Sequence, residues 1–297
     1  MKNSIIILCT IFLLATGGET LMAQGDSTVP VPSAKKNPPI KNTFGSNLVL
    51  ENQTVMVPIK GSFEFVIQHK FGNVNNGFED FYGLFAPSNI RLGFNYVPMD
   101  KLQLGTGLTK DRMQWDFNAK YALLKQTKSG NIPVSVSVFG EMAIDLRSSD
   151  NFVKNTDRIN YFTQILIARK FCDRFSAQVA PSMTYFNNVE GYVDADGKIQ
   201  PKMNNMHFAI AFLGRIKLNE KMYFLMNYDQ PLTQHPTNNP HPNISFGLEM
   251  ATSSHDFQIF MGNYDLILPA SNNFYNQNDY RIREFQIGFN ISRLWNF

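Results

Sequence analysis

The sequence predicts an all-β fold, namely a transmembrane antiparallel up-and-down β-barrel of about 12 strands. Three observations predict it. From about residue 54 onward, apolar and polar residues alternate with a period of two, as in strands with one face in lipid and the other turned inward. Aromatic residues are 13% of the chain, with 26 Phe, whereas charged residues are only 17%. Long and short connections nearly alternate between the strand segments, as in bacterial barrels.

Residues 1–23 have the pattern of a secretory signal peptide. Lys2 supplies a positive charge, an apolar run extends from Ile5 to Leu14, and Leu21-Met22-Ala23 precedes a cleavage site before Gln24. The alternative, an anchor helix, is disfavoured because the run is well short of the roughly 20 residues that a span requires. We therefore expect export to the outer membrane of a Gram-negative-type bacterium after signal-peptide cleavage.

Residues 24–53 predict a flexible periplasmic leader. The segment contains Pro30, Pro32, Pro38 and Pro39 among Lys, Ser and Asn, a composition that favours an extended and poorly ordered chain. The outer-membrane β-barrel is expected over residues 54–297.

The strands follow in order from Gly61. The clearest runs from Met113 to Leu123, where apolar residues alternate with Gln, Asp, Asn and Lys; helical spacing would scatter these residues onto all sides. In the sixth strand the alternation is less clean, because Phe162 and Leu166 fall on the polar face. The expected strand segments are 63–68, 89–96, 102–108, 113–123, 134–146, 159–167, 175–185, 208–218, 222–228, 244–250, 257–261 and 285–297.

The connections indicate which end of the barrel faces the periplasm. Those after the second, sixth, eighth and tenth strands are tight, and those after the first, fifth, seventh, ninth and eleventh are long. Short turns are typical of the periplasmic end and long loops of the exterior. Two connections depart from this alternation, a short one at 110–112 and a long one at 125–133.

The last strand keeps its apolar parity through Trp295 to the terminal Phe297. A terminal aromatic residue in the final strand is typical of proteins handed to the outer-membrane assembly machinery, so we expect that machinery and the lipid bilayer as partners. A soluble β-sandwich would also alternate, but it would not need 12 Phe-rich and Tyr-rich segments of bilayer length.

The polar face supplies the candidate lumen lining, in which acidic and basic residues are mixed. Either these charges pair with one another and fill a narrow interior, or they form the constriction of a selective pore. The candidates are Glu64, Arg91, Asp116, Lys120, Glu141, Asp145, His207, Arg215, Lys217, Glu249 and Glu284.

Several function classes are disfavoured. The formal net charge of +3 is spread without a basic cluster, so we expect no nucleic-acid partner. Catalytic motifs and paired-cysteine metal motifs are absent from the sequence, and we expect neither an enzyme nor a cofactor. An outer-membrane lipase would need a serine beside His69, and none can be nominated. His235 and His241 could bind a transition metal by imidazole, but their loop is rich in Pro and Asn, which more often serve rigidity and solvation, and we assign no metal site.

Seven sequence strings, taken in order, resemble a family of uncharacterised bacterial outer-membrane β-barrel proteins that is classed as a domain of unknown function. The likeness extends from about Thr54 to Phe297. The strings begin at Phe65, Asn89, Lys120, Pro133, Leu166, Gly214 and Phe289, and include His69-Lys70-Phe71-Gly72, Asn89-Ile90-Arg91-Leu92-Gly93 and Gly214-Arg215-Ile216-Lys217-Leu218.

This resemblance implies a barrel and no established activity. In Gly105-Thr106-Gly107-Leu108, Leu108 stands where many relatives are expected to have a basic residue, so this member's cargo would differ if that position touches cargo. The leading functional hypothesis is a pore or transporter for a small solute of unknown identity. The alternative is a filled structural or interaction barrel that binds a partner through its external loops.

Overall fold

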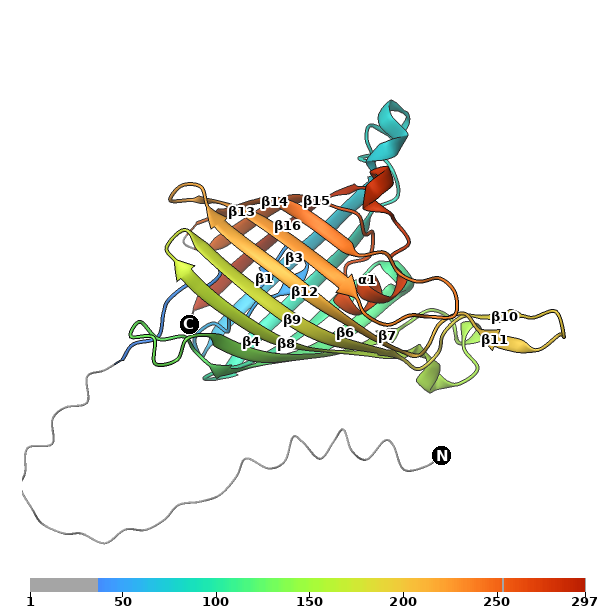
Figure 1. Cartoon of the computed structure of the whole chain (residues 1–297), viewed down its shortest axis with the longest axis horizontal. Helices are drawn as coiled ribbons and strands as arrows, with labels where there is room; N and C mark the ends of the chain where they lie inside the picture. The colour runs from blue at the N-terminus through green and yellow to red at the C-terminus, as the bar shows by residue number, and fades with distance from the viewer. Residues whose placement is uncertain (1–36, 253, 297) are drawn as a thin grey trace, which may run out of the picture. The chain divides into compact units, whose positions relative to one another are not determined.

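The computed structural model describes residues 37–252 and 254–296. Twelve antiparallel strands close into a barrel in sequence order, with the last strand paired to the first, which confirms the predicted fold class and strand count (Figure 1). Among the residues described, no helix is long and apolar enough to cross a membrane. The barrel strands are β3 (Ser62–Asn73), β4 (Asn89–Met99), β5 (Leu102–Thr109), β6 (Gln114–Leu124), β7 (Ser135–Asp145), β8 (Ile159–Cys172), β9 (Phe175–Phe186), β12 (Met206–Lys217), β13 (Met222–Pro231), β14 (Asn243–Ala251), β15 (His255–Gly262) and β16 (Gln286–Asn296).

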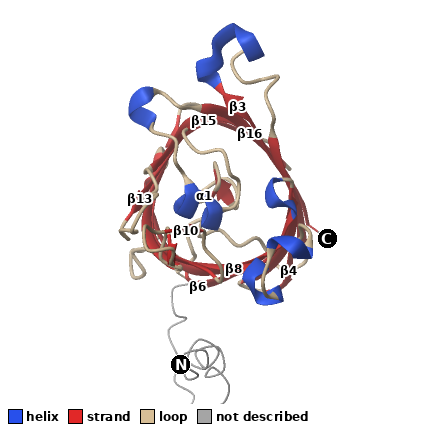
Figure 2. Cartoon of the chain, turned by 90° about the vertical axis from the view of Figure 1, so that its right-hand side faces the viewer, coloured by secondary structure: helices blue, strands red, loops and turns tan. Residues whose placement is uncertain are grey.

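Two small hairpins and several short helices complete the described chain. Two of these elements, the β1–β2 hairpin and α1, lie within the barrel, and Figure 2 shows α1 inside the ring of strands. The elements are β1 (Leu48–Val49), β2 (Asn52–Gln53), β10 (Gly191–Val193), β11 (Ile199–Pro201), α1 (Pro269–Tyr275) and the 3-10 helices η2 (Val74–Asp80), η3 (Asp111–Met113), η4 (Ser149–Asn151), η5 (Asn155–Arg158) and η6 (Tyr280–Ile282).

The period-two pattern places apolar side chains on the outside of the barrel and polar side chains on the inside. On β6, Trp115 and Phe117 are exposed outward, whereas Gln114, Asp116 and Lys120 are buried inward. Each of the 12 barrel strands is hydrogen-bonded on both sides, so the closed barrel leaves no open sheet edge. The outward apolar belt is the surface that a bilayer would cover.

The two ends of the barrel differ as predicted. Tight turns join β4 to β5, β8 to β9, β12 to β13 and β14 to β15, and we call this the short-turn end. The connections at the opposite, long-loop end include the segments between β3 and β4, between β9 and β12, and between β15 and β16. The two irregular connections predicted from the sequence also occur, since η3 makes a short link at the long-loop end and residues 125–134 a long one at the short-turn end.

Candidate functional site: a closed lumen

The segment 40–57, which we call the plug, enters the barrel at the short-turn end and returns to that end. Its start is fixed by the main-chain bond from Ile40 N to Gln126 O, 2.7 Å, beside the link between β6 and β7. β1 and β2 then form a hairpin whose turn contains Leu50 in the left-handed region, with φ 57°. The chain leaves through Pro58–Lys60 and begins β3 after Gly61.

This arrangement differs from the flexible leader predicted over residues 24–53. Residues 24–36 lie outside the described part of the chain. Residues 43–53 pack inside the barrel, with Phe44, Val49 and Leu50 fully buried. Local composition predicts disorder here because it takes no account of contacts with a wall that is distant in the sequence.

Amide side chains of the wall bind the main chain of the plug. Gln258 of β15 accepts a hydrogen bond from Leu50 N and donates one to Leu48 O, each 3.0 Å long. Gln178 of β9 accepts from Val55 N at 2.9 Å and also donates to the plug main chain. Each glutamine thus satisfies a donor and an acceptor that would be costly to bury unpaired.

Apolar contacts hold the other side of the plug. Phe44, Val49, Leu50 and Val55 form one buried cluster with inward-facing side chains of the wall. Those wall residues are Phe139, Phe162, Leu166, Ala168, Ala180, Ala211, Leu213, Leu225 and Phe260. The imperfect alternation of the sixth predicted strand therefore has a physical reason, since Phe162 and Leu166 face the plug and not water.

Two pairs of wall charges within the described residues skip a strand. The Arg91 guanidinium on β4 donates from Nε and Nη2 to the Asp116 carboxylate on β6, at 2.8 and 2.7 Å. The side chain crosses β5 at Gly107, where an added Cβ would lie 2.5 Å from Arg91 Nη2. Arg215 on β12 pairs in the same way with Glu249 on β14. Bidentate, desolvated pairs of this kind fix their side chains in one geometry.

Two further wall charges bind the plug. Lys120 Nζ donates to Gln53 Oε1 at 3.0 Å and to Thr54 O at 3.2 Å. Glu64 accepts 2.6 Å from Asn47 of the plug and 2.8 Å from Asn95 of β4. Withdrawal of the plug would therefore expose both charges to the lumen, where water could solvate them.

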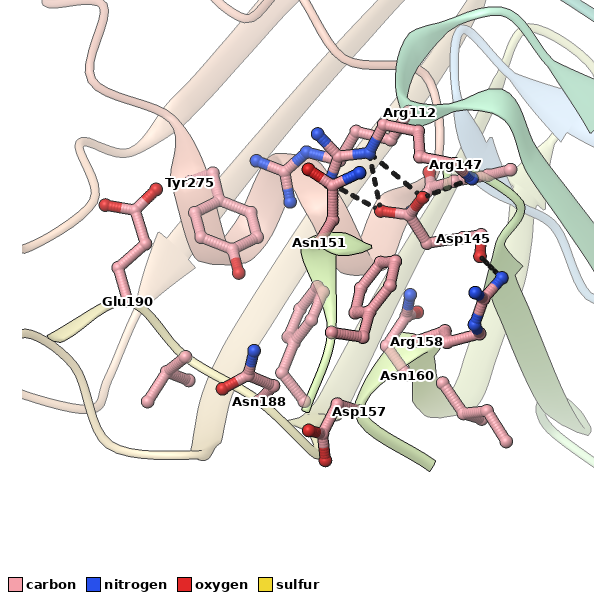
Figure 3. A pocket seen from close by; sticks show the side chains of 15 residues that line it. Arg112, Asp145, Arg147, Asn151, Asp157, Arg158, Asn160, Asn188, Glu190 and Tyr275 are labelled. Atoms are coloured by element: carbon pink, nitrogen blue, oxygen red, sulfur yellow. Dashed lines mark hydrogen bonds and ion pairs between the residues drawn. The ribbon is translucent and has the colours of Figure 1, made fainter. Parts of the chain in front are cut away.

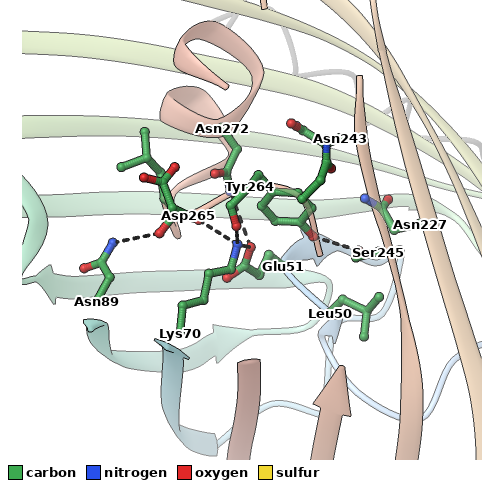
Figure 4. A network of polar contacts seen from close by, with 12 residues as sticks. Leu50, Glu51, Lys70, Asn89, Asn227, Asn243, Ser245, Tyr264, Asp265 and Asn272 are labelled. Carbon is green, nitrogen blue, oxygen red and sulfur yellow. Dashed lines mark hydrogen bonds and ion pairs between the residues drawn. The ribbon is translucent and has the colours of Figure 1, made fainter. Parts of the chain in front are cut away.

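At the tip of the plug, Glu51 forms the junction shown in Figure 4. Its carboxylate lies 2.7 Å from Lys70 Nζ of β3. Lys70 also donates to the carbonyl of Tyr264, and its ammonium lies 3.5 Å from the centroid of the Tyr264 ring. Asn272 of α1 contributes a 3.4 Å hydrogen bond to Glu51. One buried cation thus joins the plug, the wall and the loop that folds in from the opposite end.

Burial raises the pKa of Glu51 to about 7, against the opposing effects of Lys70 and of the Asn272 hydrogen bond. Asp229 of β13 adds a further, smaller increase through its negative charge. The docked plug therefore holds a proton on Glu51 more readily than a solvated glutamate would.

At the long-loop end, the segment between β15 and β16, which carries α1, folds into the lumen. Phe274 of α1 packs against Phe186, with ring centroids 4.6 Å apart, and its ring lies beside the hydrogen-bonded pair of His207 and His235. The plug and this segment thus enter the lumen from opposite ends and meet where Asn272 contacts Glu51.

The two histidines form a directed hydrogen-bond chain. His235 Nδ1 accepts from the main-chain N–H of Asn204 at 3.0 Å, so the proton of the neutral ring must lie on Nε2. His235 Nε2 then donates to His207 Nδ1 over 2.9 Å. Burial lowers the pKa of His235, which favours this neutral form. His235 therefore supports the inner end of its loop, and no cluster of three or more possible metal ligands occurs among the described residues.

Cavities flank the filled lumen at its two ends. One of about 510 Å³ lies at the short-turn end, between the plug and side chains that include Glu64 and His255. Another of about 250 Å³ lies at the long-loop end, where Arg112, Arg158 and Tyr275 contribute to its wall (Figure 3).

The structure places most of the predicted lumen residues inside the barrel. Lys217 instead lies near the short-turn end and pairs with exposed Glu220 at 2.8 Å. Glu284 lies in the loop before β16, where it accepts from Asp279 N, because the last strand begins only at Gln286. The residues buried inside are Glu64, Arg91, Asp116, Lys120, Glu141, Asp145, His207, Arg215 and Glu249.

Leu108 does not face the lumen. Its side chain is 54% exposed on the outer surface of β5, so it would meet lipid and not an internal solute. The departure at this position therefore carries no information about a cargo inside the barrel.

The lumen residues that sequence reasoning missed are those of the plug and of α1. Glu51, Asn52 and Asn272 lie in segments without a period-two pattern. The signal that could have found the plug is the set of large apolar residues on the polar faces of several strands, such as Phe162, Leu166 and Phe260.

The closed strand order, the outward apolar belt and the polar interior define a membrane β-barrel. The chain belongs to the family described as "Membrane bound beta barrel domain (DUF5777)", whose model matches residues 44–295. The matched range includes most of the plug as well as nearly all of the barrel.

Among solved structures, the chain is similar to several barrels at low identity. The NanC porin is 8% identical over 79% of this chain and 99% of that chain, with a TM-score of 0.46. An outer membrane channel from Pseudomonas putida F1 is 10% identical over 81% and 97%, with a TM-score of 0.47. The Pseudomonas putida toluene transporter TodX is 10% identical over 82% and 91%, with a TM-score of 0.40. No curated protein matches the chain.

Proposed function

We propose that this protein is an outer-membrane passage for a small polar solute, held closed by the plug until the plug withdraws toward the periplasm. The observation that carries the proposal is the path of the plug, which enters and leaves the polar lumen at the same end. A re-entrant hairpin can withdraw without threading the chain through the barrel and without breaking any strand pair of the wall.

The membrane placement rests on the outward apolar belt and on the asymmetry of the connections. The short-turn end would face the periplasm and the long-loop end the exterior of a Gram-negative-type cell. Cleavage of the signal peptide after residue 23, and assembly through the last strand ending at Phe297, remain predictions. Residues 1–36 and Phe297 lie outside the described residues.

The contacts of the plug indicate that it opens rarely without a trigger. Phe44, Val49, Leu50 and Val55 are each at least 95% buried. Complete burial of a large apolar side chain is worth about 1.5–3 kcal/mol, so these four contribute roughly 6–12 kcal/mol to docking. A partner at the periplasmic end or a bound solute would have to offset a large part of this free energy.

The polar contacts between the plug and the wall are compatible with both a docked and an undocked plug. Gln178, Gln258 and Lys120 bind main-chain atoms or an amide of the plug, and water can replace all of these partners after withdrawal. The wall charges Arg91 and Arg215 keep their own carboxylate partners in either state. An emptied lumen would thus be lined by solvated polar groups and by ion pairs that are already complete.

The test is single-channel conductance in a planar bilayer, comparing the full chain with a variant lacking residues 41–57. We expect rare openings from the full chain and steady openings from the deletion variant, with folding verified by heat-modifiable gel migration. In the deletion background, replacing Glu141 and Arg215 by alanine should change ion selectivity, since both side chains lie on the inner wall. A folded deletion variant that stays silent would overturn the proposal.

A second function is favoured by the loop between β3 and β4. η2 projects beyond the barrel rim (Figures 1 and 2), and Phe78 and Phe85 in this loop are about 80% exposed. Exposed aromatic side chains on a projecting loop suit contact with another macromolecule. A filled barrel that acts through this loop would show no conductance with or without the plug. Replacement of both phenylalanines by serine would abolish its binding to the other macromolecule.

A further inference from the structure

The cavity at the long-loop end has an arrangement of charge that the closed lumen does not require. Three arginines and three acids line it, together with asparagine amides and aromatic rings (Figure 3). Its formal charge is balanced, so its preference depends on which groups are already paired.

The carboxylates are largely engaged. Asp145 is held by both Nε and Nη2 of Arg147, with a shortest distance of 2.7 Å. Glu190 pairs with Lys202 at 3.1 Å. Asp157 accepts a hydrogen bond from the main-chain N–H of Lys154 but forms no ion pair within the described residues.

The other two arginines retain free donors. Arg158 donates from Nη1 to the main-chain oxygen of Asp145 at 3.2 Å, and its guanidinium lies 4.8 Å from the ring centroid of Phe152. The Arg112 guanidinium lies 4.3 Å from the ring centroid of Tyr275. It forms an ion pair with Asp111 at 3.8 Å, which is too long for a hydrogen bond. Stacking on a ring orients a guanidinium while leaving its edge N–H groups available.

The unused donors therefore favour an anion. After the pairs with Arg147 and Lys202 are set aside, Arg112 and Arg158 are the cations of the lining and Asp157 is its one carboxylate without an ion pair in the described chain. Asp111, which does not line the cavity, offsets part of the charge of Arg112 at 3.8 Å, but it leaves the N–H donors of that guanidinium unused. The planar fork of a guanidinium matches a carboxylate with two parallel hydrogen bonds. Phe152, Phe186 and Tyr275 supply an apolar wall against which a ring-shaped body can pack.

We propose that this cavity binds a small organic anion, with its carboxylate on Arg112 and Arg158 and its apolar body against the aromatic side chains. The inference rests on the proposed function and names the class of solute that would reach the passage from outside. One wall of the cavity is Tyr275 of α1, and the same helix contacts the plug through Asn272. Occupancy of the cavity and the position of the plug are therefore connected by a single short helix.

The experiment is isothermal titration of the purified full chain with benzoate, with neutral benzamide of the same shape as the matched probe. We expect saturable benzoate binding that weakens with added salt, and at least tenfold weaker binding of benzamide. Arg158→Gln and Arg112→Gln should each weaken benzoate binding about tenfold or more, because each removes charge-assisted donors. Arg281→Gln is the control, since Arg281 lies in the β15–β16 loop but does not line the cavity.

Equal binding of benzoate and benzamide, no binding of either, or benzoate binding unaffected by both cavity variants would overturn the inference. Arg158→Lys separates the effect of charge from that of shape, because lysine keeps the positive charge and loses the planar guanidinium fork. We expect its benzoate affinity to lie between that of Arg158→Gln and that of the unmodified chain. Titration needs no open channel, so the two proposals can fail separately. A conducting deletion variant with no benzoate site refutes the cavity alone, and a benzoate site on a barrel that never conducts refutes the passage alone.

Discussion

Truncation of the plug tip should convert a closed barrel into a frequently open one. Leu50 is fully buried among inward-facing wall residues, and Leu50→Ala removes its apolar contacts while leaving its main-chain bonds to Gln258 and Asn290 possible. Alanine and leucine experience the same strain at φ 57°, so the substitution isolates the side chain. Truncating a buried leucine costs about 2–5 kcal/mol.

This cost falls on the docked state only, because the side chain at residue 50 is solvated once the plug withdraws. At 1.4 kcal/mol per factor of ten, the ratio of open to closed barrels should rise about 30-fold to several thousand-fold. The measurement is open probability in single-channel records, with heat-modifiable migration to verify folding. Leu104→Ala is the control, because Leu104 is 45% exposed on the outer face and does not touch the plug. A folded Leu50→Ala barrel with the open probability of the unmodified chain would refute the reasoning.

Three further predictions test other parts of the structure. Because burial raises the pKa of Glu51 to about 7, the docked plug binds a proton that the free plug releases. The open probability should therefore rise by up to about tenfold per pH unit between pH 4.5 and 7. Glu51→Gln should remove this pH dependence, and a pH profile unchanged by the substitution would contradict its assignment to Glu51. Gly107→Ala should push Arg91 from its partner and lower barrel stability by about 1–3 kcal/mol, measured by thermal unfolding in detergent, whereas Gly140→Ala, which has open space around it, should not. Exposed Cys172 at the short-turn end should react with a membrane-impermeant maleimide only after the outer membrane of cells is permeabilised, and labelling of intact cells would reverse the assigned orientation.

The barrel could be predicted from the sequence because lipid imposes a simple rule on each strand. A strand such as β6 must present Trp115 and Phe117 to lipid and Asp116 to the interior, so its pattern is local and needs no knowledge of neighbours. The lengths of the connections can also be read from the local sequence, and they indicate which end of the barrel has the short turns.

The filling of the barrel could not be predicted by the same reasoning. Gln178 and Gln258 bind main-chain atoms more than 100 residues away in sequence, and main-chain binding leaves no trace in the composition of the plug. The pairing of Arg91 with Asp116 likewise depends on the register, which sets Gly107 opposite Asp116 and leaves room for the guanidinium to cross β5. The mixed charges on the polar face predict that ion pairs form, but they do not predict which acid pairs with which base.

The most direct test of the central claim is whether the plug leaves the lumen when the channel conducts. Val49→Cys, in a chain that also carries Cys172→Ser, places a thiol at a fully buried position of β1. A bulky hydrophilic thiol reagent added on the short-turn side of a planar bilayer should react only during openings and then prevent the plug from docking again. We predict an irreversible change from rare to continuous conductance. Openings that continue without any modification of the V49C thiol, or modification that leaves conductance unchanged, would contradict the account.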